Sequence, residues 1–139
     1  GAKFDPQHIV LVGVRSYETG EYNFLKSQNV RIYYMEEVHA RGLREIFLEI
    51  KLYFHAHISH YGISLDLDAF DPEFIPGVGT PSPHGLHPDE FLECLNILVD
   101  KEKLRAFEIT EFNPHLDKNQ KTITFIQNLI KELYNFRKN

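Results

Sequence analysis

Residues 63–86 constrain the fold more than any other segment, because they begin as a strand and end as a long loop rich in proline and glycine. The segment reads ISLDLDAFDPEFIPGVGTPSPHGL, and apolar residues alternate with polar ones over its first six positions. This period of two is typical of a strand. The dense proline and glycine residues from Pro72 onward predict that the strand has ended by that point. The sequence therefore predicts a strand that is followed directly by a loop whose backbone is restricted by proline residues.

Two aspartates at the end of this strand are candidate metal ligands. Asp66 and Asp68 are two residues apart, so on an extended backbone both side chains should leave the same face. Adjacent carboxylates repel each other unless a positive charge lies between them, and carboxylate oxygens suit Mg²⁺, Ca²⁺ or Mn²⁺. The alternative is a solvated acidic loop in which Asp68 or Asp71 caps a turn. The end of an apolar strand favours the metal, because ligands of open α/β sheets bind there.

Length, charge and cysteine content exclude several classes of protein. A chain of 139 residues is expected to form a single domain. The formal net charge of -5, without a basic patch, argues against a nucleic-acid partner. Cys94 is the only cysteine, which excludes a disulfide within the chain and fits the reducing cytoplasm, the location that we expect. No apolar run approaches the roughly 20 residues of a membrane span, so we expect no membrane partner.

Strands and helices alternate along the chain, which predicts an α/β fold around a mainly parallel sheet. The expected strands are 8–14, 30–35, 63–67 and 104–109, and a turn or short helix opens at 36–37. The expected helices are 21–28 (or from one turn earlier), 41–54, 88–99 and 118–137. Core-facing positions are expected at Leu43, Ile46, Phe47, Ile50, Leu52 and Phe54 of the second helix and at Ile123, Ile126, Ile130 and Leu133 of the last one.

Acidic residues at three of the four expected strand ends are candidates for a site. Glu18 and Glu21 follow the first, Asp66 and Asp68 end the third, and Glu111 follows the fourth. The carboxyl ends of parallel strands lie on one edge of a sheet, so we expect a site there. The ordinary alternative for Glu18 and Glu21 is a helix start, where acids interact favourably with the helix dipole.

Two further patterns in the sequence are alternatives to this site. His55, His57 and His60 form either a metal site or a polar connection between a helix and a strand, and zinc sites usually need additional ligands at set spacings. A D-x-D pair also occurs in phosphatases with an aspartyl nucleophile and in Mn²⁺-dependent glycosyltransferases. Ala69 and Phe70 after Asp68 do not match the former, and nothing else indicates a nucleotide-sugar site.

These motifs resemble the carboxy-terminal half of the ureohydrolase family, the arginases and agmatinases. Residues 64–81, SLDLDAFDPEFIPGVGTP, are similar to the family signature S-x-D-x-D-x-x-D-P-x-x-x-P-G-x-G-T-P. Residues 109–114, ITEFNP, resemble its E-V-N-P segment, and residues 12–38 resemble its G-x-R…E segment. The resemblance runs from about His8 to Phe136. One departure is His84, which stands where the family usually has a glycine.

The resemblance implies a three-layer, mainly parallel α/β fold, arginase-like, of which residues 1–139 would form the carboxy-terminal part as a single partial domain. It also implies two Mn²⁺ ions in the complete enzyme, which hold a bridging hydroxide. Asp66 would match the carboxylate that touches both ions and Asp68 the one that binds only the second. Glu111 would match the acid that receives the guanidinium group of the substrate. Glu18 and Glu21 would match the loop that holds its α-amino end.

Other parts of the family's active site have no counterpart in this sequence. The family takes further ligands from a G-G-D-H-type strand end and a D-A-H-x-D strand end, and neither motif occurs here. Its proton-transfer histidine also belongs to that amino-terminal half. We therefore expect no catalytic residue within the chain and no activity from the chain alone, with the missing half as its partner. A homo-oligomer is also expected, because a divided sheet leaves an unpaired edge and apolar area.

The resemblance implies hydrolysis of a small guanidinium substrate, and Asn113 in Glu111-Phe112-Asn113-Pro114 favours arginine, converted to ornithine and urea. Agmatine or a formimidoyl amino acid remains open as the substrate. A separate hypothesis is a non-catalytic, half-length relative that acts as a binding or assembly module.

Overall fold

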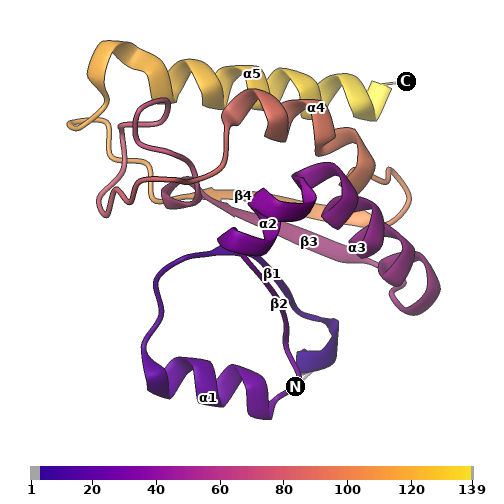
Figure 1. Cartoon of the computed structure of the whole chain (residues 1–139). Helices are drawn as coiled ribbons and strands as arrows, with labels where there is room; N and C mark the ends of the chain where they lie inside the picture. The colour runs from indigo at the N-terminus through magenta and orange to yellow at the C-terminus, as the bar shows by residue number, and fades with distance from the viewer. Residues whose placement is uncertain (1–3, 139) are drawn as a thin grey trace.

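The computed structural model describes residues 4–138 and contains all the strands and helices that the sequence predicts (Figure 1). The strands are β1 (Val10–Val14), β2 (Arg31–Tyr34), β3 (Tyr61–Asp66) and β4 (Leu104–Thr110). The helices are α1 (Thr19–Ser27), α2 (Met35–Arg41), α3 (Leu43–His57), α4 (Pro88–Leu98) and α5 (Lys121–Lys138). Three short 3-10 helices, η1 (Pro6–His8), η2 (Leu67–Ala69) and η3 (Lys118–Gln120), precede β1, follow β3 and precede α5.

The strands are parallel, as predicted, but they form two separate pairs instead of one continuous sheet. β1 pairs with β2, and β3 pairs with β4. Within residues 4–138 no ladder of hydrogen bonds joins the two pairs. The sequence pattern predicts that a segment is a strand, but it does not identify the strand's neighbours.

Helices lie on both sides of the β1–β2 pair, which agrees with the expected three-layer α/β fold (Figure 1). Figure 1 shows α2, α3, α4 and α5 on one side and α1 on the other side of the β1–β2 pair. α2 contacts β1 and β2, α3 packs against α4, and α4 packs against α5. The thicker helical layer covers one face of both strand pairs.

The main core lies between α3, α4 and the segment after β3. α3 buries a stripe of apolar residues spaced three and four apart, the spacing of an amphipathic helix. Phe47 of this stripe packs edge to face against Phe91 of α4, with ring centroids 6.1 Å apart. Phe70 meets both Phe91 and Phe125 of α5. Leu52 was expected in the core but is 71% exposed, because the buried stripe of α3 is narrower than predicted.

The buried face of α5 differs from the prediction. Asn119 and Gln120 have φ angles of 58° and 57°, which are not helical, so α5 begins only at Lys121. Its buried residues are Thr122, Phe125 and Leu129, whereas Ile130, predicted to face the core, is 54% exposed. No helix in the described part of the chain, α5 included, combines the length and apolar character that crossing a membrane requires.

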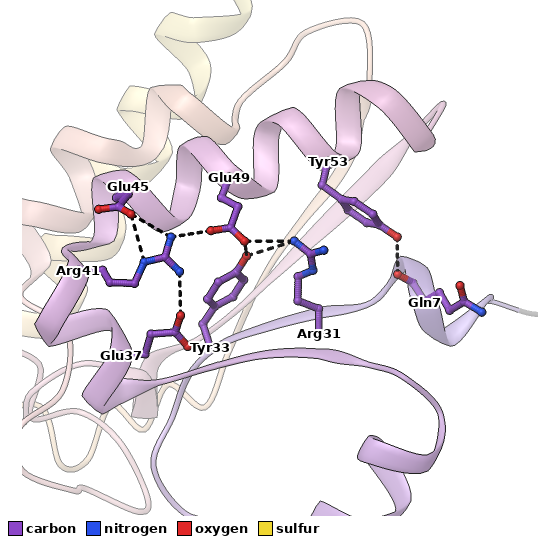
Figure 2. Close-up of polar contacts among 8 residues, drawn as sticks. All are labelled: Gln7, Arg31, Tyr33, Glu37, Arg41, Glu45, Glu49 and Tyr53. Carbon is purple, nitrogen blue, oxygen red and sulfur yellow. Dashed lines mark hydrogen bonds and ion pairs between the residues drawn. The ribbon is translucent and has the colours of Figure 1, made fainter.

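Side-chain hydrogen bonds and ion pairs join β2 and α2 to α3 (Figure 2). Glu49 of α3 accepts hydrogen bonds from Tyr33 (2.8 Å) and Arg31 (3.3 Å) of β2 and from Arg41 at the end of α2 (2.5 Å). The Arg41 and Tyr33 hydrogen bonds lower the pKa of Glu49 below its usual value. Arg41 also donates to Glu37 and Glu45. A separate hydrogen bond joins the hydroxyl of Tyr53 in α3 to the main-chain oxygen of Gln7, and the guanidinium group of Arg31 lies over the Tyr53 ring. These contacts hold the β1–β2 pair against α3, which in turn packs against α4.

Candidate functional site

The site predicted from the sequence lies where β3 ends. Asp66 is the last residue of β3 and caps η2, because its Oδ1 accepts a hydrogen bond from the amide of Asp68 at 2.8 Å. Asp68 lies inside this 3-10 turn. We expected both side chains to leave the same face of one strand. This expectation is wrong, because β3 ends at Asp66 and Asp68 lies in a 3-10 helix. Both residues line the same cavity, and the turn, not the strand period, sets the direction of Asp68.

The carboxylate of Asp68 has one satisfied oxygen and one unsatisfied oxygen. Its Oδ2 accepts a hydrogen bond from the hydroxyl of Thr80. Its Oδ1 is buried and has no hydrogen-bond partner among the described residues. A buried carboxylate oxygen without a partner is unfavourable, and a cation beside the neighbouring Asp66 would satisfy it. The donor set is therefore of the kind that Mn²⁺ accepts.

These two carboxylates do not form a complete metal site. Residues 4–138 contain no group of three or more His, Cys, Asp or Glu side chains placed to hold a metal ion. His55 and His57 lie at the end of α3, where Lys103 donates to the main-chain oxygens of His55 (3.1 Å) and Ile58 (3.0 Å). This part of the chain is a capped helix end, in agreement with the polar connection.

Arg15 joins the end of β1 to the segment after β3. It follows Val14 directly, and its guanidinium group donates to the main-chain oxygens of Asp68, Ser82 (2.5 Å) and Pro83 (2.9 Å). Arg15 is the arginine of the segment that resembles G-x-R…E, but it was not a predicted site residue. A charged residue immediately after a buried strand was the available signal, but its partners lie more than 50 residues away in the sequence.

Asp71 organises the loop that follows. Its Oδ1 accepts from the amide of Glu73 (3.0 Å) and its Oδ2 from the amide of His84 (2.7 Å). These backbone hydrogen bonds, that of Glu73 foremost, lower the pKa of Asp71 below its usual value. His84 has a φ of 61°, a region that glycine adopts more readily, which explains why a glycine is usual at this position. Gly85 lies directly against the backbone of Phe70 and Asp71.

Glu111 follows β4 at the same edge as Asp66. The register pairs Asp66 of β3 with Thr110 of β4, so Glu111 comes one residue beyond the partner of Asp66. Glu111 is exposed and has a φ of 63°. A left-handed conformation costs a residue with a side chain about 1–2 kcal/mol, and such strain concentrates at functional positions.

Glu18 and Glu21 lie on the other strand pair. Glu18 is the residue before α1, and its side chain makes no capping hydrogen bond. Glu21 lies in the first turn of α1. Both side chains are exposed.

A cavity of about 820 Å³ between β1 and β3 brings part of the predicted site together. Asp66, Asp68 and Glu21 line it, and so do Arg15 and Thr80, which the sequence analysis did not single out. Glu18 and Glu111 are not among its lining residues. The lining of the cavity therefore includes three of the five predicted site residues.

Comparison with known proteins identifies a family and a partial match. The family model described as "Arginase family" matches residues 2–135. The arginase of Bacillus caldovelox is 36% identical over 132 residues, which cover 95% of this chain and 44% of that protein. The chain therefore spans less than half the length of this relative.

Solved structures also match most of this chain and less than half of their own length. The structure of the Bacillus caldovelox arginase matches with a TM-score of 0.88 at 35% identity, covering 94% of this chain and 44% of that one. The formimidoylglutamase of Bacillus subtilis matches with a TM-score of 0.89 at 25% identity, covering 95% of this chain and 42% of that one.

Proposed function

This chain belongs to the arginase family, and from that premise we propose that it forms the carboxy-terminal part of a manganese-dependent ureohydrolase. The reaction that we propose is the hydrolysis of arginine to ornithine and urea. The observation that carries the proposal is the buried, unpartnered Oδ1 of Asp68 beside Asp66, at the end of an apolar strand. The match to curated arginases supports the choice of reaction.

The residues of this chain would contribute ligands and substrate contacts. Bound Mn²⁺ would supply hydroxide at neutral pH, which the poorly electrophilic guanidinium carbon requires. Asp66 would contact both ions and Asp68 the second one. Glu111 would hold the guanidinium group through paired, charge-assisted hydrogen bonds. Glu18 and Glu21 would hold the α-amino end, and the place of Glu21 on the cavity wall supports this role.

The chain alone should be inactive under this proposal. Two carboxylates cannot hold two metal ions, and the remaining ligands would come from the part of the family's fold that this chain does not match. We expect the isolated chain to bind Mn²⁺ no tighter than about millimolar, as sites with few ligands do. Micromolar binding in calorimetry would contradict this expectation.

A chimera tests the proposed reaction. This chain would replace the matched region of the Bacillus caldovelox arginase, and urea release from arginine would be measured with and without Mn²⁺. Mn²⁺-dependent urea release is expected, with loss of activity in the Asp66→Ala variant. A chimera that is folded by circular dichroism and binds Mn²⁺, but releases no urea, would contradict the arginase assignment.

A formimidoyl substrate is the second candidate, because the formimidoylglutamase of Bacillus subtilis is as similar in structure as the arginase is. The same chimera would be assayed with agmatine and formimidoylglutamate, and the preferred compound decides the substrate class. A folded chimera that does not bind Mn²⁺ would favour the non-catalytic, half-length relative.

We also propose a cytoplasmic location and a homo-oligomeric assembly for the complete protein. The lone cysteine, Cys94, is a buried free thiol, which fits a reducing compartment. Exposed apolar side chains such as Leu52 and Ile130 favour association. Fractionation of the source cells and light scattering of the purified protein would test the two statements.

A further inference from the structure

One side chain makes the polar connection between the segment that contains β1 and the segment that contains β3. In residues 4–138, every hydrogen bond between residues 10–21 and residues 61–86 is donated by Arg15. Its three acceptors are the main-chain oxygens of Asp68, Ser82 and Pro83. No strand ladder adds to these bonds, because β1 and β3 belong to different pairs. The polar connection between the two segments therefore depends on Arg15.

Both of the connected segments contain predicted site residues. Arg15 begins the loop that leads to Glu18 and to Glu21 in the first turn of α1. On the other side, Asp68 is a proposed metal ligand, and the hydroxyl of Thr80 donates a hydrogen bond to its carboxylate. Arg15 therefore joins the loop proposed for the α-amino end of the substrate to the turn proposed for the metal.

The other contacts of this loop are with its own strand pair. Tyr17 stacks on Tyr22 of α1, with ring centroids 5.8 Å apart, and packs against Tyr34 of β2, with centroids 5.4 Å apart. α1 buries none of its residues, and its Phe24 is 63% exposed. These contacts hold the loop to the β1–β2 pair, but they do not relate it to the end of β3. That relation is left to Arg15.

The three acceptors match the shape of a guanidinium group. Nη1 of Arg15 donates to Ser82 at 2.5 Å and to Pro83 at 2.9 Å, whereas Nη2 donates to Asp68. A guanidinium group holds five N–H donors in fixed directions in one plane, whereas the ammonium group of lysine is a single point with three donors. Lysine at position 15 would therefore keep the positive charge but could not keep all three hydrogen bonds.

We propose that Arg15 is a positioning residue for the ureohydrolase reaction, which sets the distance between the substrate loop, residues 16–21, and the metal-ligand turn, residues 66–69. The inference rests on the proposed function for the roles of these two segments. A substrate held at its α-amino end by the loop must present its guanidinium carbon at the turn. A misplacement of about 1 Å in such an arrangement can slow a reaction about 100-fold. Arg15 itself would contact neither substrate nor metal.

Paramagnetic broadening in the isolated chain tests this distance without any reaction. Mn²⁺ at about millimolar concentration would be added to the isotope-labelled chain, and NMR would record the broadening of the amides of Ala69 in the turn and Glu21 in the loop. Both amides should broaden in the wild-type chain, because broadening falls steeply with distance from the ion. Arg15→Lys should reduce the broadening at Glu21 at least about twofold and leave that at Ala69 unchanged.

Two control variants accompany this measurement. Asp68→Asn should abolish the broadening of both amides, because it removes a proposed ligand. Arg105→Lys should leave both unchanged, because Arg105 is an exposed residue of β4. Arg15→Lys would first be checked for a native circular dichroism spectrum.

A double-mutant cycle in the chimera with the Bacillus caldovelox arginase provides a kinetic test. Arg15→Lys should lower kcat/KM for arginine at least about tenfold. Glu21→Gln should then cost at least about threefold less in the Arg15→Lys background than in the wild-type background, because both substitutions disturb one contact. A purely structural role of Arg15 would instead give losses that multiply.

Several outcomes would overturn the inference. Equal broadening of the Glu21 amide in wild type and Arg15→Lys would show that the loop keeps its distance without Arg15. No broadening of this amide in the wild-type chain would place the loop too far from the turn. Losses that multiply in the cycle would assign Arg15 to stability alone. A chimera that releases no urea would contradict the proposed reaction, and the broadening would then decide the role of Arg15 by itself.

Discussion

The guanidinium group of Arg15 donates a hydrogen bond to the main-chain oxygen of Asp68 and not to its carboxylate. The ion pairs of residues 4–138 include neither Asp66 nor Asp68. The nearby positive charge therefore fixes the backbone after β3, while the two carboxylates stay available for a cation. The predictions below follow from this arrangement and from the loop that supports it.

Replacing Arg15 should destabilise the chain. Arg15→Ala removes the hydrogen bonds to Asp68, Ser82 and Pro83, and hydrogen bonds from a charged donor support a loss of about 2–3 kcal/mol. Urea denaturation of the isolated chain measures this loss. Arg105→Ala is the control, because Arg105 is an exposed residue of β4, and it should change stability by less than about 0.5 kcal/mol. Equal effects of the two substitutions would contradict the structural role of Arg15.

Neutralising Asp68 should stabilise the chain when divalent metals are absent. Asp68→Asn removes the charge from a carboxylate with a buried, unpartnered oxygen, and a gain of up to about 1 kcal/mol is expected. The exposed Asp66 is the comparison, and Asp66→Asn should shift stability by less than about 0.5 kcal/mol. Thermal or urea unfolding in the presence of a chelator gives both values. A clear loss of stability in Asp68→Asn would mean that its carboxylate has a structural partner.

Substitutions of Asp66 and Asp68 should have different effects on the Mn²⁺-dependent activity of the chimera with the Bacillus caldovelox arginase. Asp66→Ala should abolish Mn²⁺-dependent activity, because the proposed role of Asp66 is to contact both ions. Asp68→Ala should weaken one site first, so its residual activity should require more Mn²⁺. Metal titration of urea release distinguishes the two patterns. Equal and mild effects would count against the assigned roles.

Asp71 should make stability depend on pH in the acidic range. Hydrogen bonds from the amides of Glu73 and His84 lower the pKa of Asp71 in the folded state. The ionised Asp71 therefore stabilises the folded chain at pH values above its unfolded pKa of about 3.9. That contribution is lost as the pH falls through the lower folded pKa. Asp71→Asn should cost about 1–2 kcal/mol at pH 7.

The difference in stability between wild type and Asp71→Asn should shrink below about pH 4. Unfolding by urea at a series of pH values measures it. Glu73→Gln is the control, because Glu73 is exposed and its amide, not its carboxylate, bonds to Asp71. A difference that stays constant from pH 7 to pH 3 would disprove the role of the Asp71 carboxylate.

Gly85 should not tolerate a side chain. A Cβ atom there would lie 2.5 Å from the amide nitrogen of Asp71 and overlap the backbone of Phe70, so Gly85→Ala should destabilise by about 3 kcal/mol. Gly79 in the same loop has open space around it, and Gly79→Ala should be neutral or slightly stabilising. Denaturation of both variants measures the contrast. A tolerated alanine at position 85 would mean that the loop does not pack as described.

Much of the secondary structure could be predicted from the sequence, because it depends on local patterns. The apolar run before Arg15 and the alternation before Asp66 are both strands in the structure. The ends of elements were predicted less well. α5 begins three residues later than expected because Asn119 and Gln120 adopt left-handed conformations. The residues that it buries also differ from those predicted.

The candidate site was predictable only in part. Asp66 and Asp68 were predicted as an acidic pair after an apolar strand, and both line the same cavity in the structure. The prediction assumed that both side chains lie on one strand face, whereas a 3-10 turn sets the position of Asp68. Thr80 and Arg15 lie in the segments that resemble the family, but their hydrogen bonds to Asp68 were not predicted, because these bonds span 12 and 53 residues of sequence.

The sequence by itself determined which segments are strands and helices, which acids follow the strands and which family the motifs resemble, since neighbouring residues carry that information. The tertiary structure alone decided that β1 and β3 face each other across a cavity instead of pairing, and that Arg15 connects their ends. Strand pairing joins residues 21 positions apart in β1–β2 (Val10 with Arg31) and 44 apart in β3–β4 (Ile63 with Phe107), and the hydrogen bonds of Arg15 span 53 to 68 positions. No local pattern encodes such contacts.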